Sequence, residues 1–202
     1  MENKTETQKN EYKTLLLSTE RQGMTELIEW LETTDFFTAP ASTRFHGNYE
    51  AALCEHSLKV YKTLYKMNNV FALPDQKIPK DSIIISSLLH DICKANFYIK
   101  SLKNVKDGKK LNYQKKEVDN WIEKEVYTVD DKTPMGHSEK SVILTQRFIK
   151  LTDLEIYLIL IHMGITDSTK NYINGVLKLY PSAILLHLSD FLSSSLYEKT
   201  IE

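Results

Sequence analysis

The sequence has few cysteines and lacks any long apolar run. Cys54 and Cys93 are its only cysteines. Both fall in segments that we expect to be buried helices, so we predict no disulfide framework and a reducing compartment. No stretch approaches the roughly 20 consecutive apolar residues that a membrane span needs, and the polar start of the chain lacks the apolar core of a secretory signal. These absences predict a soluble, cytoplasmic protein.

The sequence also carries almost no net charge and contains no repeats or low-complexity segments. Its formal net charge of −1 argues against a protein that generally coats nucleic acid or membrane surfaces. With 202 residues, 42% of them hydrophobic, the chain can bury one sizeable core. We therefore expect a single domain over residues 1–202. Its polar N-terminal segment, residues 1–22, is expected to form a frayed or surface helix without chemistry.

Apolar residues at helical spacing predict a mostly or entirely α fold. Thr152 and Glu155 form a capping box sequence before one of the apolar runs, and Gly164 is expected to close that helix, with His162 in its last turn. Asn48 and Asp81 are expected to cap two earlier helices. The expected helices cover residues 24–33, 49–68, 83–94, 138–150, 153–163 and 182–196.

Charge is segregated in an insert at residues 97–132. Residues 98–116 contain seven lysines and one acid, whereas residues 117–131 contain six acids and one lysine. Asp107-Gly108 predicts a turn, and residues 126–129 are β-prone. We expect a charged excursion laid over the core, in the form of a small β-hairpin. It is either a solvated surface insert or a guide for a polyanionic substrate.

The most informative stretch is residues 83–94, IIISSLLHDICK, an apolar run that carries the adjacent pair His90 and Asp91. An apolar core offers no favourable place for an imidazole beside a carboxylate unless something holds them. Several other expected helices or helix edges each present one polar side chain on an apolar face, and together they predict a shared polar centre. These side chains are His56, His137, His162 and Asp190.

Four imidazoles and two carboxylates have the right chemistry to hold two divalent ions. Nitrogen and oxygen ligands without thiolate favour manganese or iron, with magnesium, cobalt, nickel and zinc as further candidates. A carboxylate can bridge two ions through its two oxygens, and we assign this role to Asp91. Two ions about 3.5–4 Å apart can clamp the attacking and leaving oxygens of a displacement at phosphorus.

The ordered set of motifs resembles the HD-domain metal-dependent phosphohydrolase superfamily over about residues 36–196. The motifs are LCEHSL at His56, LLHDICK at His90 and Asp91, MGHSEKS at His137, LILIHMG at His162 and LHLSD at Asp190. The resemblance implies a helical bundle around one or two metal ions. It implies core ligands at His56, His90, Asp91 and Asp190, and an additional pair for binuclear members at His137 and His162.

The flanking sequences are similar to stand-alone bacterial or phage HD hydrolases and to the HD portion of 3′–5′ exoribonucleases. The chain departs from the family pattern at two places. The usual HDIGK reads HDICK here, so Cys93 replaces a glycine, and the usual glycine pair before the first metal histidine reads Ala51-Ala52. Both departures keep small residues, so we expect the ligands to be retained.

Several side chains around the centre are candidates for substrate contacts. Lys94 matches the family lysine near the substrate phosphate, although an ordinary surface lysine is the alternative. Arg44 and His46, in the loop before the first metal helix, could bind a phosphate or protonate the leaving oxygen, or could only support the loop. Ser138 and Lys140 follow a metal histidine at a helix start, where anions are favoured. His187 is expected to pack near Asp190 rather than to bind metal.

The leading hypothesis is a binuclear phosphohydrolase that cleaves a phosphodiester or phosphomonoester of a nucleotide or short oligonucleotide. A metal-bound hydroxide attacks phosphorus in this hypothesis, while Lys94 and Arg44 hold phosphate oxygens. Short RNA or DNA is a weaker substrate hypothesis than a nucleotide. One alternative is an HD-fold di-iron oxygenase similar to myo-inositol oxygenase, which cleaves a C–C or C–P bond with the same ligand count. Another is a non-catalytic module that binds a metal or a nucleotide.

Overall fold

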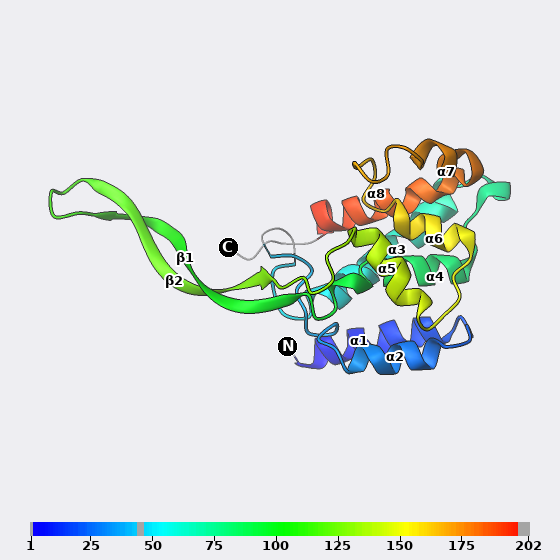
Figure 1. Cartoon of the computed structure of the whole chain (residues 1–202), viewed down its shortest axis with the longest axis horizontal. Helices are drawn as coiled ribbons and strands as arrows, with labels where there is room; N and C mark the ends of the chain where they lie inside the picture. Colours follow the sequence, from blue (N-terminus) through cyan, green and yellow to red (C-terminus); the bar gives the residue numbers. More distant parts are fainter. Residues whose placement is uncertain (1, 44–46, 198–202) are drawn as a thin grey trace.

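The computed structural model describes residues 2–43 and 47–197 and shows a helical body from which one long β-hairpin projects (Figure 1). The fold is mostly helical, as the sequence predicts. None of the helices in the described ranges is both long and apolar enough to cross a membrane. The helices are α1 (Glu2–Leu17), α2 (Met24–Glu32), α3 (Ala52–Phe71), α4 (Lys80–Leu89), α5 (His137–Gln146), α6 (Asp153–Leu160), α7 (Ile173–Leu179) and α8 (Ile184–Leu192). Short turns of helix lie at η1 (Pro74–Gln76), η2 (Ile92–Lys94), η3 (Pro181–Ala183) and η4 (Ser193–Tyr197).

Helix α4 lies at the centre of the body and packs against α1, α3 and α6. Every residue from Ser82 to Leu89 is buried, as expected for a helix that is apolar on nearly all sides. Its buried serines remain hydrogen-bonded, because Ser86 Oγ donates to the Ser82 carbonyl (2.6 Å) and Ser87 Oγ to the Ile83 carbonyl (2.6 Å). The core therefore surrounds the helix that leads directly into His90 and Asp91.

Helix α1 is part of the core, which corrects the expectation of a frayed or surface helix. Tyr12 and Leu16 are fully buried, and Tyr12 Oη donates a hydrogen bond of 2.7 Å to the Leu88 carbonyl of α4. The Tyr12 ring also packs against Phe36 and Phe37. Tyr12 and Leu16, with the partly buried Leu15, provide the core packing in a mostly polar helix, so the sequence pattern of α1 alone does not reveal it.

Several predicted helix boundaries are wrong, and three of these errors bear on the site. Helix α3 begins at Ala52 rather than Tyr49, because Ala51 adopts a left-handed backbone with φ 63°. Helix α4 ends at Leu89, and Asp91 (φ −109°, ψ 15°) leads into η2. Helix α6 ends at Leu160, so His162 follows the helix instead of lying in its last turn. His90, Asp91 and His162 therefore lie just beyond the ends of buried helices.

The predicted capping box of α6 is confirmed, and its glutamate also holds together distant parts of the fold. The Glu155 side chain is fully buried and accepts the Thr152 backbone N–H (2.8 Å). Arg21 forms a two-pronged ion pair with it, at 3.1 and 2.9 Å, and Ser82 Oγ donates to it at 3.0 Å. Burial raises the pKa of Glu155, but hydrogen bonds from Arg21 and Thr152 outweigh it and leave this pKa below 4.5.

Substituting Glu155→Gln is expected to lower the free energy of unfolding at neutral pH by about 3 kcal/mol, because it leaves the Arg21 charge without its buried partner. The folded-state pKa of Glu155 is lowered, so its stabilising effect is present above pH 4.5 and is lost as the pH falls through the folded-state value. Urea unfolding should therefore show that the difference in free energy of unfolding between wild type and variant becomes smaller below pH 4.5. Lys13→Ala, which breaks an exposed pair with Glu32, is the control and should have little effect. A difference in free energy of unfolding that stays constant down to low pH would contradict the stabilising role assigned to ionised Glu155.

The insert forms a hairpin of β1 (Tyr98–Leu111) and β2 (Glu117–Val129), which pair antiparallel with Tyr98 opposite Val129. It projects away from the helical body (Figure 1), which corrects the expectation that it covers the core. The predicted turn at Asp107-Gly108 is also wrong. The register shifts there, between Lys106 and Lys109, and Gly108 has φ 67°, as in a β-bulge. The chain instead reverses at residues 112–116, where Asn112 Oδ1 accepts the backbone N–H groups of Gln114 (2.9 Å) and Lys116 (3.0 Å).

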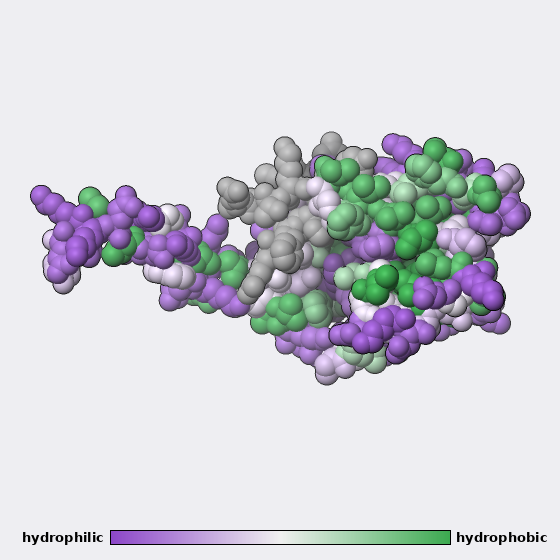
Figure 2. Space-filling model, turned by 90° about the horizontal axis from the view of Figure 1, so that it is seen from above, coloured by the Kyte–Doolittle hydropathy of each residue, from purple (hydrophilic) through white to green (hydrophobic). Residues whose placement is uncertain are grey.

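Strand alternation gives the hairpin two chemically different faces. One face carries all four acids of β2, and three of them pair with lysines of β1 at 3.6, 2.7 and 3.0 Å. The opposite face, here called the acid-free face, carries Lys103, Lys110 and Lys124 beside Val105 and Ile122, and its paired strand positions hold no carboxylate. Lys103 lies directly opposite Lys124, a like-charge arrangement that costs stability in isolation. Figure 2 shows a mostly hydrophilic hairpin surface interrupted by separate hydrophobic patches.

Candidate metal centre

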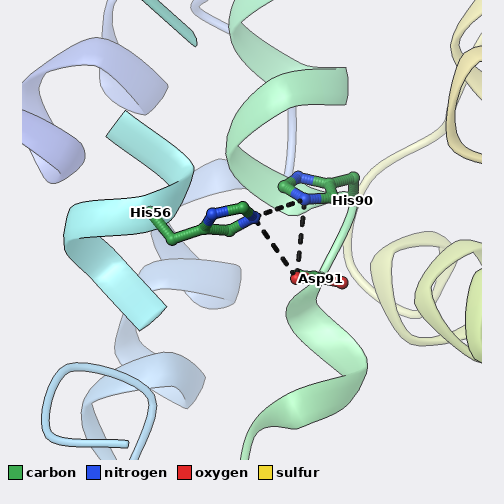
Figure 3. A group of neighbouring side chains, drawn as sticks. All are labelled: His56, His90 and Asp91. Carbon is green, nitrogen blue, oxygen red and sulfur yellow. Dashed lines mark hydrogen bonds and ion pairs between the residues drawn. The ribbon is translucent and has the colours of Figure 1, made fainter. Parts of the chain in front are cut away.

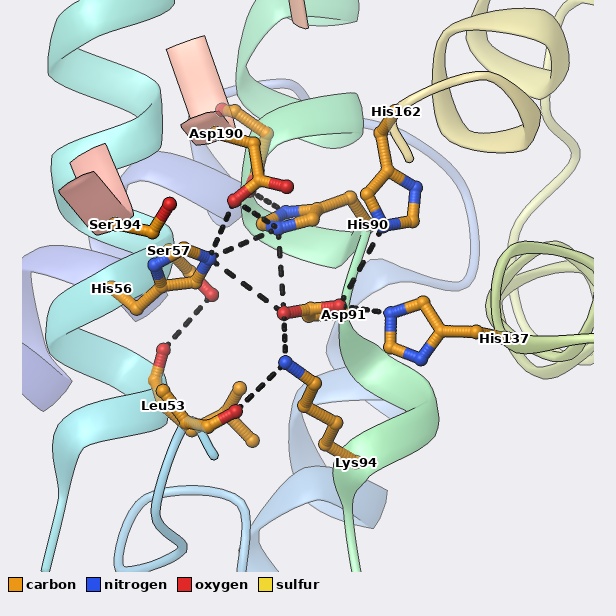
Figure 4. A network of polar contacts seen from close by, with 12 residues as sticks. Leu53, His56, Ser57, His90, Asp91, Lys94, His137, His162, Asp190 and Ser194 are labelled. Carbon is orange, nitrogen blue, oxygen red and sulfur yellow. Dashed lines mark hydrogen bonds and ion pairs between the residues drawn. The ribbon is translucent and has the colours of Figure 1, made fainter. Parts of the chain in front are cut away.

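The structure brings all six sequence-predicted metal ligands together in the helical body (Figure 4). They come from segments far apart in the chain: α3, the turn after α4, the first residue of α5, the turn after α6, and α8. The least exposed side chains lie at the centre, and those of Asp190 and His137 lie nearer the surface. The six residues are His56, His90, Asp91, His137, His162 and Asp190.

One group of ligand atoms surrounds Oδ2 of Asp91 (Figure 3). The Nε2 atoms of His56 and His90 are 3.3 Å apart and lie 3.6 and 3.5 Å from that oxygen. Asp190 Oδ1 lies 3.2 Å from His56 Nε2 and 4.0 Å from His90 Nε2. Ligand atoms about 2.0–2.2 Å from a shared ion stand roughly 3.0–4.2 Å from one another. The spacing of this group therefore fits a single divalent ion.

A second group faces the other carboxylate oxygen, Oδ1 of Asp91. His137 Nε2 lies 2.5 Å from this oxygen and His162 Nε2 lies 3.8 Å from it. Within the described residues, His162 Nε2 is one of two buried side-chain nitrogen or oxygen atoms that have no hydrogen-bond partner. A buried polar atom without a partner is costly, and a bound cation would satisfy this nitrogen. The two oxygens of one carboxylate thus face two different sets of imidazoles.

Backbone hydrogen bonds fix the orientation of the two most buried imidazoles. His90 Nδ1 lies 2.8 Å from the Ser87 carbonyl, and His162 Nδ1 lies 2.6 Å from the Ile159 carbonyl. A carbonyl only accepts, so Nδ1 carries the proton in both rings and the lone pair of Nε2 faces the centre. His187 contacts the cluster through the backbone of one of its members, because its Nδ1 donates to the His162 carbonyl at 2.7 Å. This contact agrees with its expected packing role.

The electrostatic environment favours protonation states that can bind metal at His90, His162 and Asp91. Burial, with His90 nearby, lowers the pKa of His162 to about 3, and burial also lowers the pKa of His90. Burial acts to raise the pKa of Asp91, but Lys94, His90 and His137 together bring it well below its usual value. His137 differs, because Asp91 outweighs its burial and raises its pKa to about 10. The centre therefore presents neutral imidazoles at His90 and His162 beside an ionised carboxylate.

Lys94 lies on η2 rather than on the continuous helix over residues 83–94 that the sequence predicts. Its Nζ lies 2.7 Å from Asp91 Oδ2 and donates to the Ala41 carbonyl at 2.8 Å. Lys94 also lines a cleft of about 240 Å³ that reaches the first ligand group. Met163 and Phe191, which are 49% and 61% exposed, form part of the cleft lining. A cation and two apolar side chains thus border the candidate metal centre.

Of the other residues predicted to contact substrate, some lie beside the candidate centre and some do not. Arg44 and His46 lie outside the described residues. Ser138 stays beside the centre, with its Oγ 3.4 Å from His162 Nδ1. Lys140 does not join the cluster: its Nζ pairs with Asp131 Oδ1 at 2.5 Å and lies 5.1 Å from the centre of the Phe97 ring. Asp131, which follows β2, therefore holds Lys140 in an ion pair near the base of the hairpin.

Three residues beside the candidate centre have contacts that the sequence did not predict. Cys93 Sγ lies 3.2 Å from His137 Nδ1, and its replacement of the family glycine was the available signal. Met163 and Phe191 border the cleft, and each directly follows a predicted ligand in the sequence. An exposed apolar residue beside a metal ligand could have indicated the rim of a binding site.

One stretch of the chain is similar to a known enzyme. Over 63 residues, or 31% of this chain, it is 41% identical to a dihydroneopterin 2′,3′-cyclic phosphate phosphodiesterase of Methanocaldococcus jannaschii. The matched stretch covers 25% of that enzyme, so the chain spans about a quarter of the relative that it matches. No family model matches the chain, and no solved structure matches it significantly. Part of the chain is therefore related to a phosphodiesterase.

Proposed function

We propose that this chain is a metal-dependent phosphohydrolase of the HD superfamily that cleaves phosphodiester bonds of nucleotide-like substrates. The observation that carries the proposal is the position of Asp91, whose Oδ2 faces His56 and His90 while its Oδ1 faces His137 and His162. The partial similarity to a phosphodiesterase supports the same reaction class.

The ligand groups divide naturally between two ions that share one carboxylate. His56, His90, Asp91 and Asp190 would hold the first ion, and Asp91, His137 and His162 would hold the second. Bound divalent ions would supply Lewis acidity, which activates water for attack on phosphorus and neutralises charge on the phosphate oxygens. Nitrogen and oxygen donors of this kind suit manganese, iron and similar divalent ions.

The remaining polar and apolar side chains of the cleft would bind and orient the substrate. Lys94 places an ammonium beside Asp91, where it can bind a phosphate oxygen and stabilise charge that develops during the displacement. The exposed side chains of Phe191 and Met163 can contact the planar ring of a nucleotide-like group. The related enzyme is named for a cyclic phosphate substrate, so 2′,3′-cyclic nucleotides are the first substrates to examine.

A substrate panel tests this proposal directly. The full chain, loaded in turn with Mn²⁺, Fe²⁺, Co²⁺ and Zn²⁺, should hydrolyse at least one 2′,3′-cyclic nucleotide, linear dinucleotide or short RNA, with release of a new phosphomonoester. The activity should disappear with a chelator and return when the metal is restored. Metal-loaded protein that hydrolyses none of these phosphodiesters would contradict the proposal.

The acid-free face of the hairpin is expected to attract longer anionic substrates, because its lysines have no acidic partner in the part of the chain that the structure describes. Substituting Lys103 and Lys124 together by glutamate should raise KM for a short RNA, most strongly at low salt, and should leave KM for a cyclic mononucleotide unchanged. Substituting Lys106 and Lys109 by glutamate is the matched control. These lysines are already paired with Asp119 and Glu117, so we expect a smaller effect on KM for RNA. Equal effects of the two double substitutions would contradict a role for the acid-free face.

A further inference from the structure

His187 lies on α8, three residues before Asp190, and lines the cleft that reaches the first ligand group. Its Nδ1 donates a hydrogen bond of 2.7 Å to the His162 carbonyl. A neutral imidazole carries one proton and a carbonyl can only accept, so this bond places the proton on Nδ1 and leaves a lone pair on Nε2. Nε2 of the neutral ring can therefore accept a hydrogen bond but cannot donate one.

Two further contacts hold the His187 ring in place. Gly164 lies so close to it that a Cβ atom at this position would come within 2.7 Å of Cε1 and 2.8 Å of Nε2. Gly164 also has φ 73°, a left-handed conformation that glycine adopts without strain. The ring centre of Phe191 lies 6.4 Å from that of His187, with an angle of 35° between the two planes. The tautomer and the position of the His187 ring are therefore set before any ligand binds.

The second ring nitrogen of His187 is available to a ligand. Among the residues that the structure describes, no side chain or backbone group makes a hydrogen bond to His187 Nε2. The buried side-chain atoms without a partner in those residues are Thr145 Oγ1 and His162 Nε2, so His187 Nε2 is not closed off from solvent. A fixed acceptor that is open to a cleft selects among ligands, because a ligand with a donor gains a hydrogen bond there and a ligand without one does not.

Phe191 indicates which part of a ligand would reach this nitrogen. Its side chain is 61% exposed, lines the same cleft and follows His187 by about one helical turn. An exposed aromatic ring beside a hydrogen-bond acceptor suits a planar heterocycle, which can stack on the ring and present an N–H group to the acceptor. Lys94, which also lines the cleft, lies beside Asp91 and binds the phosphate in the proposed function. The phosphate and the heterocycle of one substrate would therefore occupy different parts of this cleft.

We propose that His187 is a specificity-determining residue, and that its Nε2 accepts a hydrogen bond from the base of a nucleotide-like substrate. The proposal rests on the proposed function, because it concerns the same cleft and names the class of substrate that the cleft selects. That class is a nucleotide whose base carries an N–H group, either an amino group or a protonated ring nitrogen. A single neutral hydrogen bond of this kind corresponds to a preference of about fivefold to tenfold over a base that offers only acceptors.

Nucleotides that differ in the donors of the base test this proposal. The reference is the 2′,3′-cyclic phosphate of purine riboside, whose base carries no N–H group, and the comparison substrates are the 2′,3′-cyclic phosphates of adenosine, inosine and guanosine. For the Mn²⁺-loaded full chain, we expect kcat/KM to be about fivefold to tenfold higher for at least one donor-bearing base than for the reference. His187→Asn keeps an amide that can donate to the His162 carbonyl but lacks Nε2. This variant should lose the preference, while its kcat/KM for the reference stays close to that of wild type.

The ratio between substrates separates a lost hydrogen bond from structural damage, because damage lowers kcat/KM for every substrate alike. Ser194→Ala is the matched control, since Ser194 lines the same cleft but its Oγ donates to the Phe191 carbonyl at 3.0 Å. We expect this variant to keep the wild-type preference. Hydrolysis without any preference in wild type would overturn the role of His187 and leave the phosphohydrolase intact. A preference that survives in His187→Asn, or one that is lost in Ser194→Ala, would do the same.

Equilibrium binding provides a second readout that does not depend on hydrolysis. The 3′-monophosphates of the same four nucleosides are expected to bind the metal-loaded full chain in isothermal titration calorimetry, with the same preference for a donor-bearing base and the same loss in His187→Asn. If no cyclic phosphate is hydrolysed but this preference in binding is found, the proposed reaction is wrong and the contact with the base is supported. If the nucleotides are neither hydrolysed nor bound with a preference, both proposals are overturned.

Discussion

Substituting Asp91→Ala is expected to abolish phosphodiester hydrolysis and to lower the content of both metal ions together. Oδ2 of Asp91 lies 3.5 Å from His90 Nε2, while its Oδ1 lies 2.5 Å from His137 Nε2. Removing this one side chain therefore takes a carboxylate oxygen away from each of the two ligand groups. Loss of several kcal/mol of charge stabilisation corresponds to a fall in kcat/KM of at least about 10³-fold. The measurements are steady-state kinetics on a cyclic nucleotide and elemental analysis of the same sample.

Two further variants make this result specific. Asp91→Asn keeps the size of the side chain but removes its charge, and circular dichroism should show that it stays folded. Asp190→Ala is the matched control, because Asp190 approaches only the first ligand group, 3.2 Å from His56 Nε2. It should lower metal content at one position more than at the other. Asp91 variants that retain two ions per chain would contradict the shared carboxylate.

Substituting Lys94→Met is expected to lower kcat/KM by roughly 10²–10³-fold while both ions remain bound. The substitution keeps most of the side-chain volume but removes the ammonium that lies beside Asp91, and loss of one pre-positioned charge donor near the transition state typically has an effect of this size. Kinetics with a cyclic nucleotide and elemental analysis measure the two quantities. Loss of metal along with activity would show that Lys94 supports the ligands rather than the substrate.

Lys140→Met provides the comparison for this prediction. The sequence places Lys140 after a metal histidine, as a second candidate for phosphate binding, whereas the structure pairs it with Asp131. We therefore expect a much smaller change in kcat/KM per folded molecule than for Lys94→Met. An equal loss of activity in the two variants would indicate that Lys140 contacts the substrate phosphate, as the sequence suggested.

The clustering of the six candidate ligands could be predicted from the sequence, because each of them is an unusual polar residue in its local segment. His90 and Asp91 follow an apolar run, and the four other polar side chains were expected on apolar helix faces or helix edges, so the sequence predicted that these six residues would lie together. The sequence pattern did not show that α4 ends before Asp91, because a backbone change over one residue leaves the hydrophobic period unaltered. It also did not show the capture of Lys140 by Asp131, which depends on how the hairpin returns to the body.

For the hairpin, the sequence predicted that two strands would form, but it did not predict their length or the position of the turn. Segregated charges and the β-prone residues 126–129 indicated a hairpin, and β1 and β2 confirm it. Its length reflects continuous pairing from Tyr98 opposite Val129 to Leu111 opposite Glu117, which the sequence pattern did not show. Asp107-Gly108 has the composition of a turn, but the glycine serves a bulge instead. Asn112 closes the actual reversal with two side-chain hydrogen bonds.

If Asp91 bridges two ions, their unpaired electrons are coupled, and electron paramagnetic resonance of the full chain saturated with Mn²⁺ measures that coupling. At about 3.5–4 Å the two ions interact through the shared carboxylate. We expect two manganese ions per chain with an exchange-coupled spectrum in wild type, and only the spectrum of isolated Mn²⁺ in Asp91→Asn. Two manganese ions per wild-type chain with the spectrum of isolated ions would contradict a bridged binuclear centre.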